Sequence, residues 1–160
     1  MLKVELEPAG AERAQTLKNL FQFYVHDFAD FWPVRRAELQ EDGQFGTYPP
    51  LPTYWTDPDR SAFLIRADGQ IAGFVMLDHE SHSGRPVDWN MGEFWVARHY
   101  RREGVGRIAA RQAIGSRRGQ WELAVARRNT AAQAFWRGVA AELATGPVEE
   151  IDQDDARWNG

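Results

Sequence analysis

The order of apolar and polar positions predicts a chain that alternates between strands and helices. Residues 2–7 place an aliphatic side chain at every second position, as a half-buried strand does, and Pro8 ends the run. Residues 11–31 carry apolar side chains at helical spacing, and this helix is expected to break before Pro33. Its aromatic residues are interpreted mainly as core, namely Phe21, Phe23, Tyr24, Phe28, Phe31 and Trp32.

A hairpin is predicted in the middle of the chain. Strands at 61–66 and 70–78 flank Asp68-Gly69, the strongest short hairpin signal. Residues 43–59, in contrast, are rich in proline and predict a long loop. The aromatic residues of this loop favour an ordered flap over a linker, namely Tyr48, Tyr54 and Trp55.

The second half of the chain continues the alternation. A strand at 87–97 leads into a helix that ends near residue 117, and the next strand is expected at 121–126. Asn129 is a suitable N-cap for a helix that runs through residue 144.

Two final strands are expected at 148–151 and 156–158. The second is so short that this edge of the sheet is either incomplete or completed by another chain.

Composition narrows the class of protein. The chain has 160 residues, which is most simply one domain. It contains no apolar run of membrane-spanning length and no basic-then-apolar leader, so we expect a cytoplasmic protein without a membrane partner. The absence of cysteine excludes a disulfide framework, a cysteine zinc site and acyl transfer through a cysteinyl thioester.

Charge is distributed unevenly along the chain. Residues 1–90 hold 8 Lys and Arg against 14 Asp and Glu, whereas residues 98–137 hold ten arginines against Glu103 and Glu122. A nucleic-acid patch is one interpretation of the basic segment. We disfavour it because the arginines lie within a helix–strand–helix run and the remaining chain is acidic.

The basic segment contains the most informative stretch of the chain. Residues 94–113 read FWVARHYRREGVGRIAARQA, which predicts a strand, a turn and a helix. The first backbone N–H groups of a helix attract anions, and Gly104 and Gly106 allow a ligand to approach the backbone there. Arginines 101, 102 and 107 add charge-assisted donors. The stretch therefore predicts an anion-binding turn.

Two common phosphate-binding motifs do not fit this turn. Residues 104–109 match the dinucleotide fingerprint, but residues 98–103 separate the first glycine from its strand and Glu122 opens the following strand instead of closing it. A P-loop needs Lys and Ser or Thr after the second glycine, where the chain has Arg107 and Ile108.

A metal site is also disfavoured. His79 and His82 are three residues apart beside Ser83-Gly84, whereas the zincin motif needs histidines four apart on a helix. We therefore expect a solvated loop there and no bound metal.

The turn resembles motif A of the GNAT superfamily of acetyl-CoA-dependent N-acetyltransferases. Residues 100–107 read YRREGVGR and place Arg101, Gly104 and Gly106 on the defining positions of Q/R-x-x-G-x-G/A. Downstream, residues 129–136 read NTAAQAFW and resemble the N-x-x-A-x-x-F-Y helix opening of the family. The two motifs stand in the right order, and the chain resembles small single-domain bacterial members over nearly all its length.

The resemblance implies a fold and an activity. The fold would be α/β (α+β), a single GNAT domain over residues 1–160 with a mixed, mostly antiparallel sheet of six or seven strands, split where strands four and five diverge, and helices on both faces. The activity would be transfer of an acetyl group from acetyl-CoA to a primary amine of a small molecule by direct attack. A non-catalytic acyl-CoA-binding module of the same fold is the alternative, and a homodimer is compatible with both.

The resemblance also implies where acetyl-CoA binds. Its pyrophosphate would lie on the turn and its pantetheine arm along the preceding strand, whose backbone N–H would hold the oxyanion of the reaction. The implied cofactor-binding residues are Phe94, Trp95, Val96, Arg101, Arg102, Glu103, Gly104, Val105, Gly106, Arg107, Asn129 and Trp136.

A general base must accept a proton from the acceptor ammonium. Glu93, immediately before the implied cofactor strand, is the first candidate, while Asp88 and Asp27 are weaker ones. The simpler interpretation of Glu93, a carboxylate that pairs with an arginine or faces solvent, stays open.

The general acid is less clearly indicated. Trp136 stands where the family often has a tyrosine that protonates the departing thiolate, and an indole cannot deliver that proton. Tyr24, Tyr100 or water would take this role, or the thiolate needs no acid at all.

In a GNAT fold the first helix and the following loop wall the acceptor site. Asp27, Tyr48 and Trp55 are the implied substrate-binding residues. The acidity of this half of the chain favours a cationic amine, although ordinary surface acidity explains it equally well.

Overall fold

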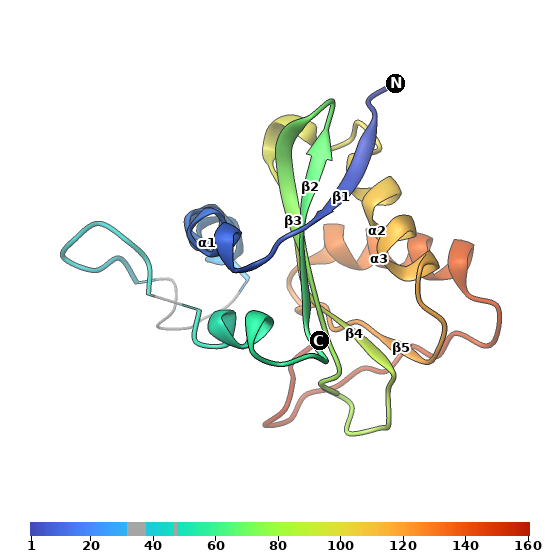
Figure 1. Cartoon of the computed structure of the whole chain (residues 1–160). Helices are drawn as coiled ribbons and strands as arrows, with labels where there is room; N and C mark the ends of the chain where they lie inside the picture. The colour runs from blue at the N-terminus through green and yellow to red at the C-terminus, as the bar shows by residue number, and fades with distance from the viewer. Residues whose placement is uncertain (32–37, 47) are drawn as a thin grey trace.

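The computed structural model describes residues 1–31, 38–46 and 48–160. Trp32 and Pro33, where the first helix was expected to break, lie outside the described residues. Within these ranges five strands form one sheet in the order β1-β2-β3-β4-β5 (Figure 1). The strands are β1 (Val4–Pro8), β2 (Ser61–Ala67), β3 (Gln70–Asp78), β4 (Trp89–Val96) and β5 (Trp121–Glu122). The α-helices are α1 (Ala14–Phe28), α2 (Val105–Gly115) and α3 (Thr130–Leu143).

The sheet is antiparallel from β1 to β4, and β5 joins β4 in parallel. The predicted hairpin is confirmed: β2 and β3 meet at a tight turn in which Asp68 and Gly69 both have positive φ, 47° and 79°. None of the described helices is long and apolar enough to cross a membrane.

The expected six or seven strands are not confirmed, because the C-terminal part of the sheet is much reduced. The strand expected at 121–126 has only two paired residues, Trp121 and Glu122. The strands expected at 148–151 and 156–158 are replaced by an isolated bridge between Asp154 and Asn159. The side chains of Val148 and Ile151 are 57% and 40% exposed. Because its apolar side chains do not pack on the core, this segment gains little stability from forming a strand.

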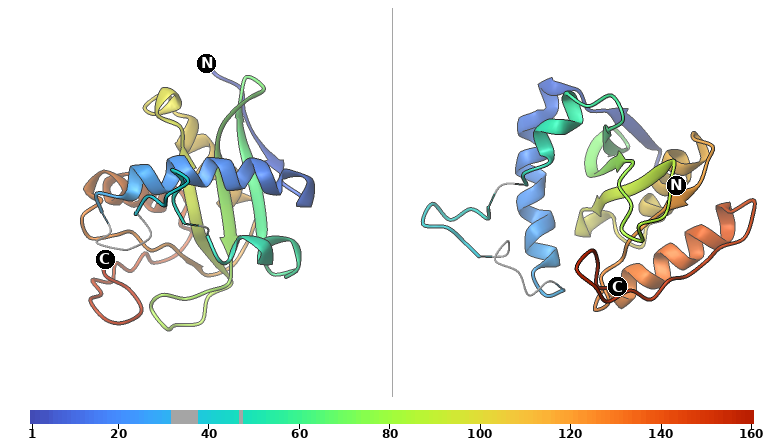
Figure 2. Two further views of the ribbon diagram at one scale, coloured as in Figure 1. Left: turned by 90° about the vertical axis from the view of Figure 1, so that its left-hand side faces the viewer. Right: turned by 90° about the horizontal axis from the view of Figure 1, so that it is seen from below.

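Helices cover both faces of the sheet, as predicted (Figures 1 and 2). Helix α1 and the short 3₁₀ helix η3 (Leu51–Trp55) pack with Phe74 and Met76 of β3 on one face. Helices α2 and α3 pack with Val75 and Leu77 on the other face. Because β3 is buried on both sides, it is an almost continuous apolar run.

Strand β4 contains a β-bulge that changes the face of its later residues. Met76 is paired with Glu93 and Leu77 with Met91, so Gly92 is the additional residue. Met91 belongs to the apolar cluster under α2 and α3. After the bulge, Glu93 lies on the α1 side of the sheet.

The packing under α1 yields a stability prediction. Phe74 is fully buried and stacks on Phe21 and Trp95, with ring centroids 4.8 and 5.9 Å away, whereas Phe23 on α1 is 60% exposed. We expect Phe74→Ala to lower the free energy of unfolding by about 3–5 kcal/mol, because it leaves a cavity. The matched Phe23→Ala change should lower it by less than about 1 kcal/mol. Urea denaturation measures both, and similar losses would show that the face under α1 is not a packed core.

Candidate active site

The candidate site lies where β4 and β5 separate. The two strands pair only through Trp89–Trp121 and Asn90–Glu122, and β4 then continues to Val96. This divergence is the split expected between the fourth and fifth strands. A parallel ladder of two residue pairs is short, so side-chain contacts must hold its end in place.

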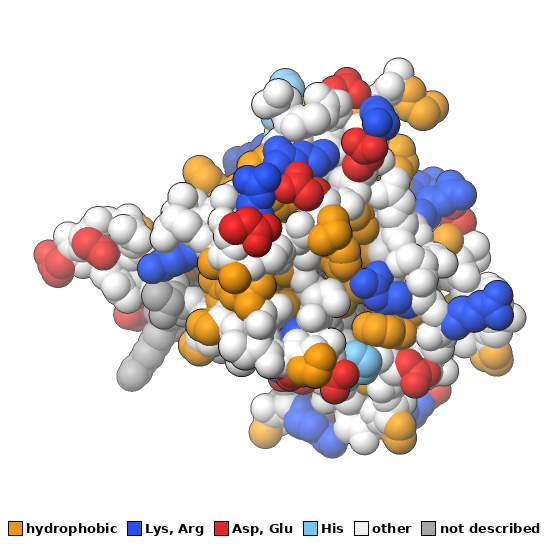
Figure 3. All heavy atoms as spheres, in the orientation of Figure 1, with side chains coloured by type: hydrophobic (Ala, Val, Ile, Leu, Met, Phe, Trp, Pro, Cys, Tyr) orange, Lys and Arg blue, Asp and Glu red, His pale blue; other side chains and the backbone are white. Residues whose placement is uncertain are grey.

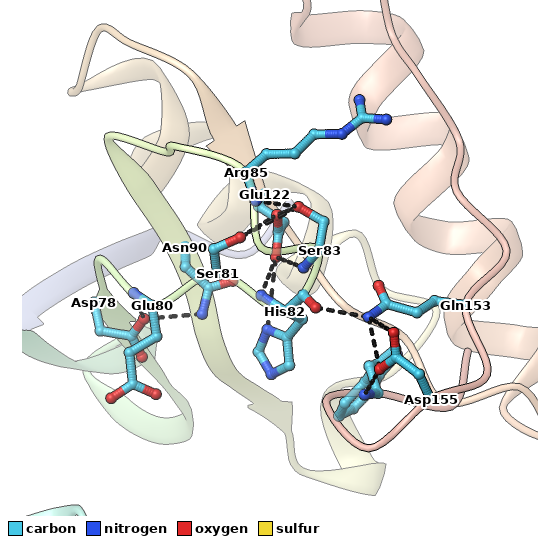
Figure 4. A network of polar contacts seen from close by, with 11 residues as sticks. Asp78, Glu80, Ser81, His82, Ser83, Arg85, Asn90, Glu122, Gln153 and Asp155 are labelled. Carbon is cyan, nitrogen blue, oxygen red and sulfur yellow. Dashed lines mark hydrogen bonds and ion pairs between the residues drawn. The ribbon is translucent and has the colours of Figure 1, made fainter.

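Glu122 fixes that end of the split to the loop between β3 and β4 (Figure 4). Its carboxylate accepts hydrogen bonds from the backbone N–H groups of His82 and Ser83 at 2.5 and 3.2 Å. The hydroxyls of Ser81 and Ser83 donate to its other oxygen at 3.1 and 2.5 Å. Partial burial opposes ionisation, but the hydrogen bonds from Ser83 and His82 outweigh it and lower the pKa of Glu122. The loop expected to be merely solvated is therefore tied to β5.

A second buried contact fixes β4 to β3 at the same level. Asn90 is 1% exposed and donates from its amide to Asp78 at 2.9 Å. Asp78 is itself 4% exposed and also accepts from the Tyr54 hydroxyl at 3.2 Å. Among the residues described, no group of three or more His, Cys, Asp or Glu side chains could hold a metal ion.

The turn before α2 has the geometry of an anion-binding site. Arg102 and Gly104 both have left-handed backbones, with φ of 66° and 80°, and Gly104 is the N-cap of α2 without a side-chain cap. In the described part of the chain, no hydrogen bond of good geometry runs from the backbone N–H groups of residues 102–107 to a carbonyl outside α2. Consecutive N–H groups of this kind, at the positive end of a helix dipole, form a cradle for phosphate.

The arginines of this turn contact protein groups to very different degrees. Arg101 donates to the carbonyl of Val96 at 2.7 Å and to Asp27. Arg107 donates to Glu142 of α3 at 2.6 Å. No described carboxylate pairs with Arg102, which is exposed beside the N-terminus of α2. The backbone N–H groups and Arg102 thus remain available to an anion.

Carboxylates that follow the basic segment in sequence neutralise much of its charge. On the face shown in Figure 3, basic and acidic side chains are interspersed and form no single basic patch. This arrangement is unlike an extended nucleic-acid surface. Besides Arg107, three arginines of the segment pair with these later carboxylates, in Arg111–Glu142, Arg127–Asp152 and Arg137–Glu150.

Of the remaining expected cofactor residues, Phe94, Val96 and Trp136 lie on the α2–α3 side, whereas Trp95 belongs to the cluster under α1. Phe94 packs edge-on against Trp136, with centroids 5.0 Å apart, and Trp136 is only 8% exposed. Asn129 caps α3 by accepting from the N–H of Ala132 at 3.1 Å. A Cβ on Gly106 would make ordinary contacts with Val96 and Phe135 at 3.5 and 3.6 Å, so this glycine packs β4, α2 and α3 together.

The expected catalytic residues meet on the α1 side of β4. The hydroxyl of Tyr24 donates to Oε2 of Glu93, and the hydroxyl of Tyr48 also hydrogen-bonds this carboxylate. Tyr48 stacks on Phe21 with centroids 4.6 Å apart. Burial, with the charge of Glu93, raises the pKa of Tyr48, so its hydroxyl stays a donor at neutral pH.

Tyr54 and Asp78 belong to the same polar cluster, and sequence reasoning did not assign them to the site. Burial, together with the Asp78 and Glu93 charges, raises the pKa of Tyr54. A Cβ on Gly92 would clash with Oδ2 of Asp78 and would lie 3.1 Å from Oη of Tyr54, which places both groups over the bulge. The available signal was an aspartate at the end of an otherwise apolar strand.

Other candidates are engaged elsewhere. Asp27 accepts from Trp95 at 2.9 Å and pairs with two arginines. Trp55 donates from its indole to the Ala9 carbonyl at 2.9 Å, which holds η3 against the end of β1. Asp88 accepts from the N–H of Gln120 at 2.6 Å, at the start of β4. Tyr100 packs partly buried on the α2–α3 side, away from Glu93.

A family model described as the acetyltransferase (GNAT) family matches residues 17–139. The chain belongs to the GNAT family. The turn before α2, the divergence of β4 and β5 and the N-cap of α3 all lie within the matched residues.

Solved GNAT structures share the fold at low identity. The aminoglycoside acetyltransferase AAC(6')-Iy, in complex with the bisubstrate analogue CoA-S-monomethyl-acetylneamine, is 18% identical with a TM-score of 0.59, over 96% of this chain and 99% of that one. An acetyltransferase from Thermus thermophilus is 21% identical with a TM-score of 0.63, over 86% and 85%. An aminoglycoside acetyltransferase from an uncultured soil metagenomic sample, in complex with sisomicin, is 12% identical with a TM-score of 0.57, over 95% and 97%. Comparison with curated proteins gives no match.

The Glu122 contacts predict an acid-sensitive end of the split. Because its folded pKa is lowered, Glu122 stabilises the native state at neutral pH, and this contribution is lost as pH falls from the ordinary pKa of a glutamate through the lower folded pKa. We expect Glu122→Gln to cost about 1–3 kcal/mol of unfolding free energy at pH 7 and to remove this pH dependence.

Amide hydrogen exchange at His82 and Ser83 should accelerate in the same variant. The exposed Glu149, whose one ion pair among the described residues is with Arg85, provides the control Glu149→Gln, for which we expect no such change. Equal exchange in Glu122→Gln and wild type would contradict the assigned role.

Proposed function

We propose that residues 1–160 form a single GNAT domain that transfers an acetyl group from acetyl-CoA to a primary amine by direct attack. One observation carries the proposal: β4 presents a carboxylate, Glu93, on one face and runs within a few residues into the uncapped N-terminus of α2. A candidate base and an anion-binding turn are thereby fixed by the same strand. Family membership makes acetyl transfer the reaction that best matches this pairing.

The turn fits the nucleotide end of acetyl-CoA as co-substrate. The backbone N–H groups of residues 102–107 would receive the pyrophosphate, and Arg102 would add a cationic donor. The β4 backbone from Phe94 to Val96 would bind the pantetheine arm along the split. Two structures of AAC(6')-Iy, one with CoA and one with the bisubstrate analogue, contain this kind of ligand in a related fold.

Acetyl-CoA supplies an activated thioester, so the main chemical task left to the protein is proton transfer. Glu93 would accept the proton of the acceptor ammonium, directly or through water. Tyr24 and Tyr48, both hydrogen-bonded to Glu93, orient its carboxylate. The Tyr24 hydroxyl would return a proton to the leaving sulfur, because Trp136 carries only an indole N–H.

We propose a cationic small-molecule amine as the acceptor. The carboxylate of Glu93 lies on the α1 side of the sheet beside the rings of Tyr24 and Tyr48, and such a wall suits an ammonium with an apolar or sugar portion. Several of the related structures are aminoglycoside acetyltransferases, so aminoglycosides lead the panel of amines to test. Tyr48 would contact the acceptor, and Trp55 would shape the wall.

A non-catalytic acyl-CoA-binding module is the second candidate, and Trp136 is the observation that favours it. A broad amine panel assayed for acetyl-CoA consumption separates the two functions. Tight CoA binding without turnover on any amine would establish the module.

Co-substrate binding is tested first. A ligand at 100 times its Kd stabilises the native state by about 2.7 kcal/mol, and we expect acetyl-CoA to raise the melting temperature of the wild type accordingly. Gly106→Val should abolish this shift, because its larger side chain would push against Val96 and Phe135 and force the start of α2 away from β4. Gly106→Ala should retain it, since a Cβ fits there in ordinary contact and motif A allows alanine. A full shift in the valine variant would refute the assigned binding site.

Proton removal by Glu93 is tested separately. We expect Glu93→Gln to lower kcat by about 10²–10⁴ at neutral pH. The loss of kcat should be smaller at high pH, because the acceptor amine, whose pKa is about 10, is already deprotonated there. The exposed Glu12 provides the control Glu12→Gln, which should leave kcat unchanged. A loss that is independent of pH would indicate that Glu93 has a structural role.

A further inference from the structure

Asp27 connects helix α1 to three points on the cofactor side of the site. One carboxylate oxygen accepts from the indole N–H of Trp95 at 2.9 Å and from the guanidinium of Arg101. The other oxygen accepts from Arg98 at 3.0 and 3.1 Å. The Asp27 side chain is only 11% exposed, whereas the side chains of Arg98 and Arg101 are 73% and 41% exposed, so a mostly buried carboxylate holds two arginines that reach the surface.

Arg101 is the contact that reaches the turn. Its guanidinium joins Asp27 to the carbonyl of Val96, so the residue is held both by α1 and by the end of β4. The next residue, Arg102, has a left-handed backbone that a non-glycine residue rarely adopts. Such a conformation persists only when the surrounding structure enforces it.

We propose that Asp27 is a positioning residue that holds the anion-binding turn in its binding conformation by anchoring Arg101. The inference rests on the proposed use of this turn for acetyl-CoA, and it replaces direct acceptor binding as the role of Asp27. Both carboxylate oxygens already face protein donors, which leaves little capacity for a substrate ammonium. Helix α1, which contributes Tyr24 to the Glu93 cluster, is thereby coupled to the turn through one side chain.

The proposed positioning role and a purely electrostatic role of Asp27 predict opposite changes in CoA affinity when the carboxylate is removed. Asp27 places a negative charge beside Arg98 and Arg101, so its removal would strengthen the attraction of a polyanion if charge alone mattered. If position matters, removal frees Arg101, loosens the turn and weakens binding. The direction of the change in CoA affinity therefore separates the two roles.

The test compares Asp27→Asn with Asp30→Asn, which removes the same charge from an exposed position three residues later. We expect the Kd for free CoA and the KM for acetyl-CoA to rise about five- to tenfold in Asp27→Asn only, with kcat and the KM for the amine changed less than about twofold. Unchanged or tighter CoA binding in a folded Asp27→Asn protein overturns the proposal, as does an equal loss in Asp30→Asn.

Two further readouts keep the test independent of catalysis. Backbone ¹⁵N order parameters of residues 102–106 in the ligand-free protein should fall in Asp27→Asn and stay unchanged in Asp30→Asn. In a double-mutant cycle, adding Asp27→Asn to Arg101→Gln should cost no further CoA affinity, because both changes remove the same anchor. Additive losses, or unchanged order parameters, overturn the proposal. A wild type that does not bind CoA refutes the proposed function instead, and the order parameters still report on the anchor.

Discussion

Strands β4 and β5 are hydrogen-bonded through two residue pairs and then separate, and the candidate site depends on this short ladder. Because two pairs contribute little by themselves, the end of the ladder is secured by side chains. Asn90 donates to the buried Asp78 on β3, and Glu122 binds the loop between β3 and β4. If the ladder were longer, the backbone hydrogen-bonding groups at this edge of β4 would be paired with β5. If these side-chain contacts were absent, β5 would have little to keep it beside β4.

Charge compensation limits the anion-binding region to a small area. Six of the ten arginines of residues 98–137 pair with carboxylates from α1, α3 and the C-terminal segment, so much of the charge of the basic segment is compensated. What remains beside the turn is the row of backbone N–H groups and Arg102. Fixed dipoles of this kind suit one phosphate group in one orientation, whereas an extended set of unpaired arginines would attract polyanions generally.

Local signals in the sequence predicted local structure well. Asp68-Gly69 predicted its hairpin, Asn129 its cap, and the glycines after Arg101 predicted an uncapped helix start. Features that depend on distant partners could not be predicted this way. The contact between Asp27 and Arg101 spans 74 residues, and the bond between Ser83 and Glu122 spans 39. The length of β5 was also overestimated, because periodicity describes the strand itself and not whether a neighbour accepts its hydrogen bonds.

The bulge at Gly92 has a consequence for where a charge can lie in this sheet. In a regular strand Glu93 would share a face with Met91, whose side chain belongs to the apolar cluster beneath α2 and α3. A carboxylate there would be buried without donors and would destabilise the fold. The additional residue reverses the alternation, so that Glu93 meets two tyrosine hydroxyls on the opposite face. If Gly92 instead took an ordinary paired place in the strand, the proposed base would move from a hydrogen-bonded setting into the apolar core beneath α2 and α3.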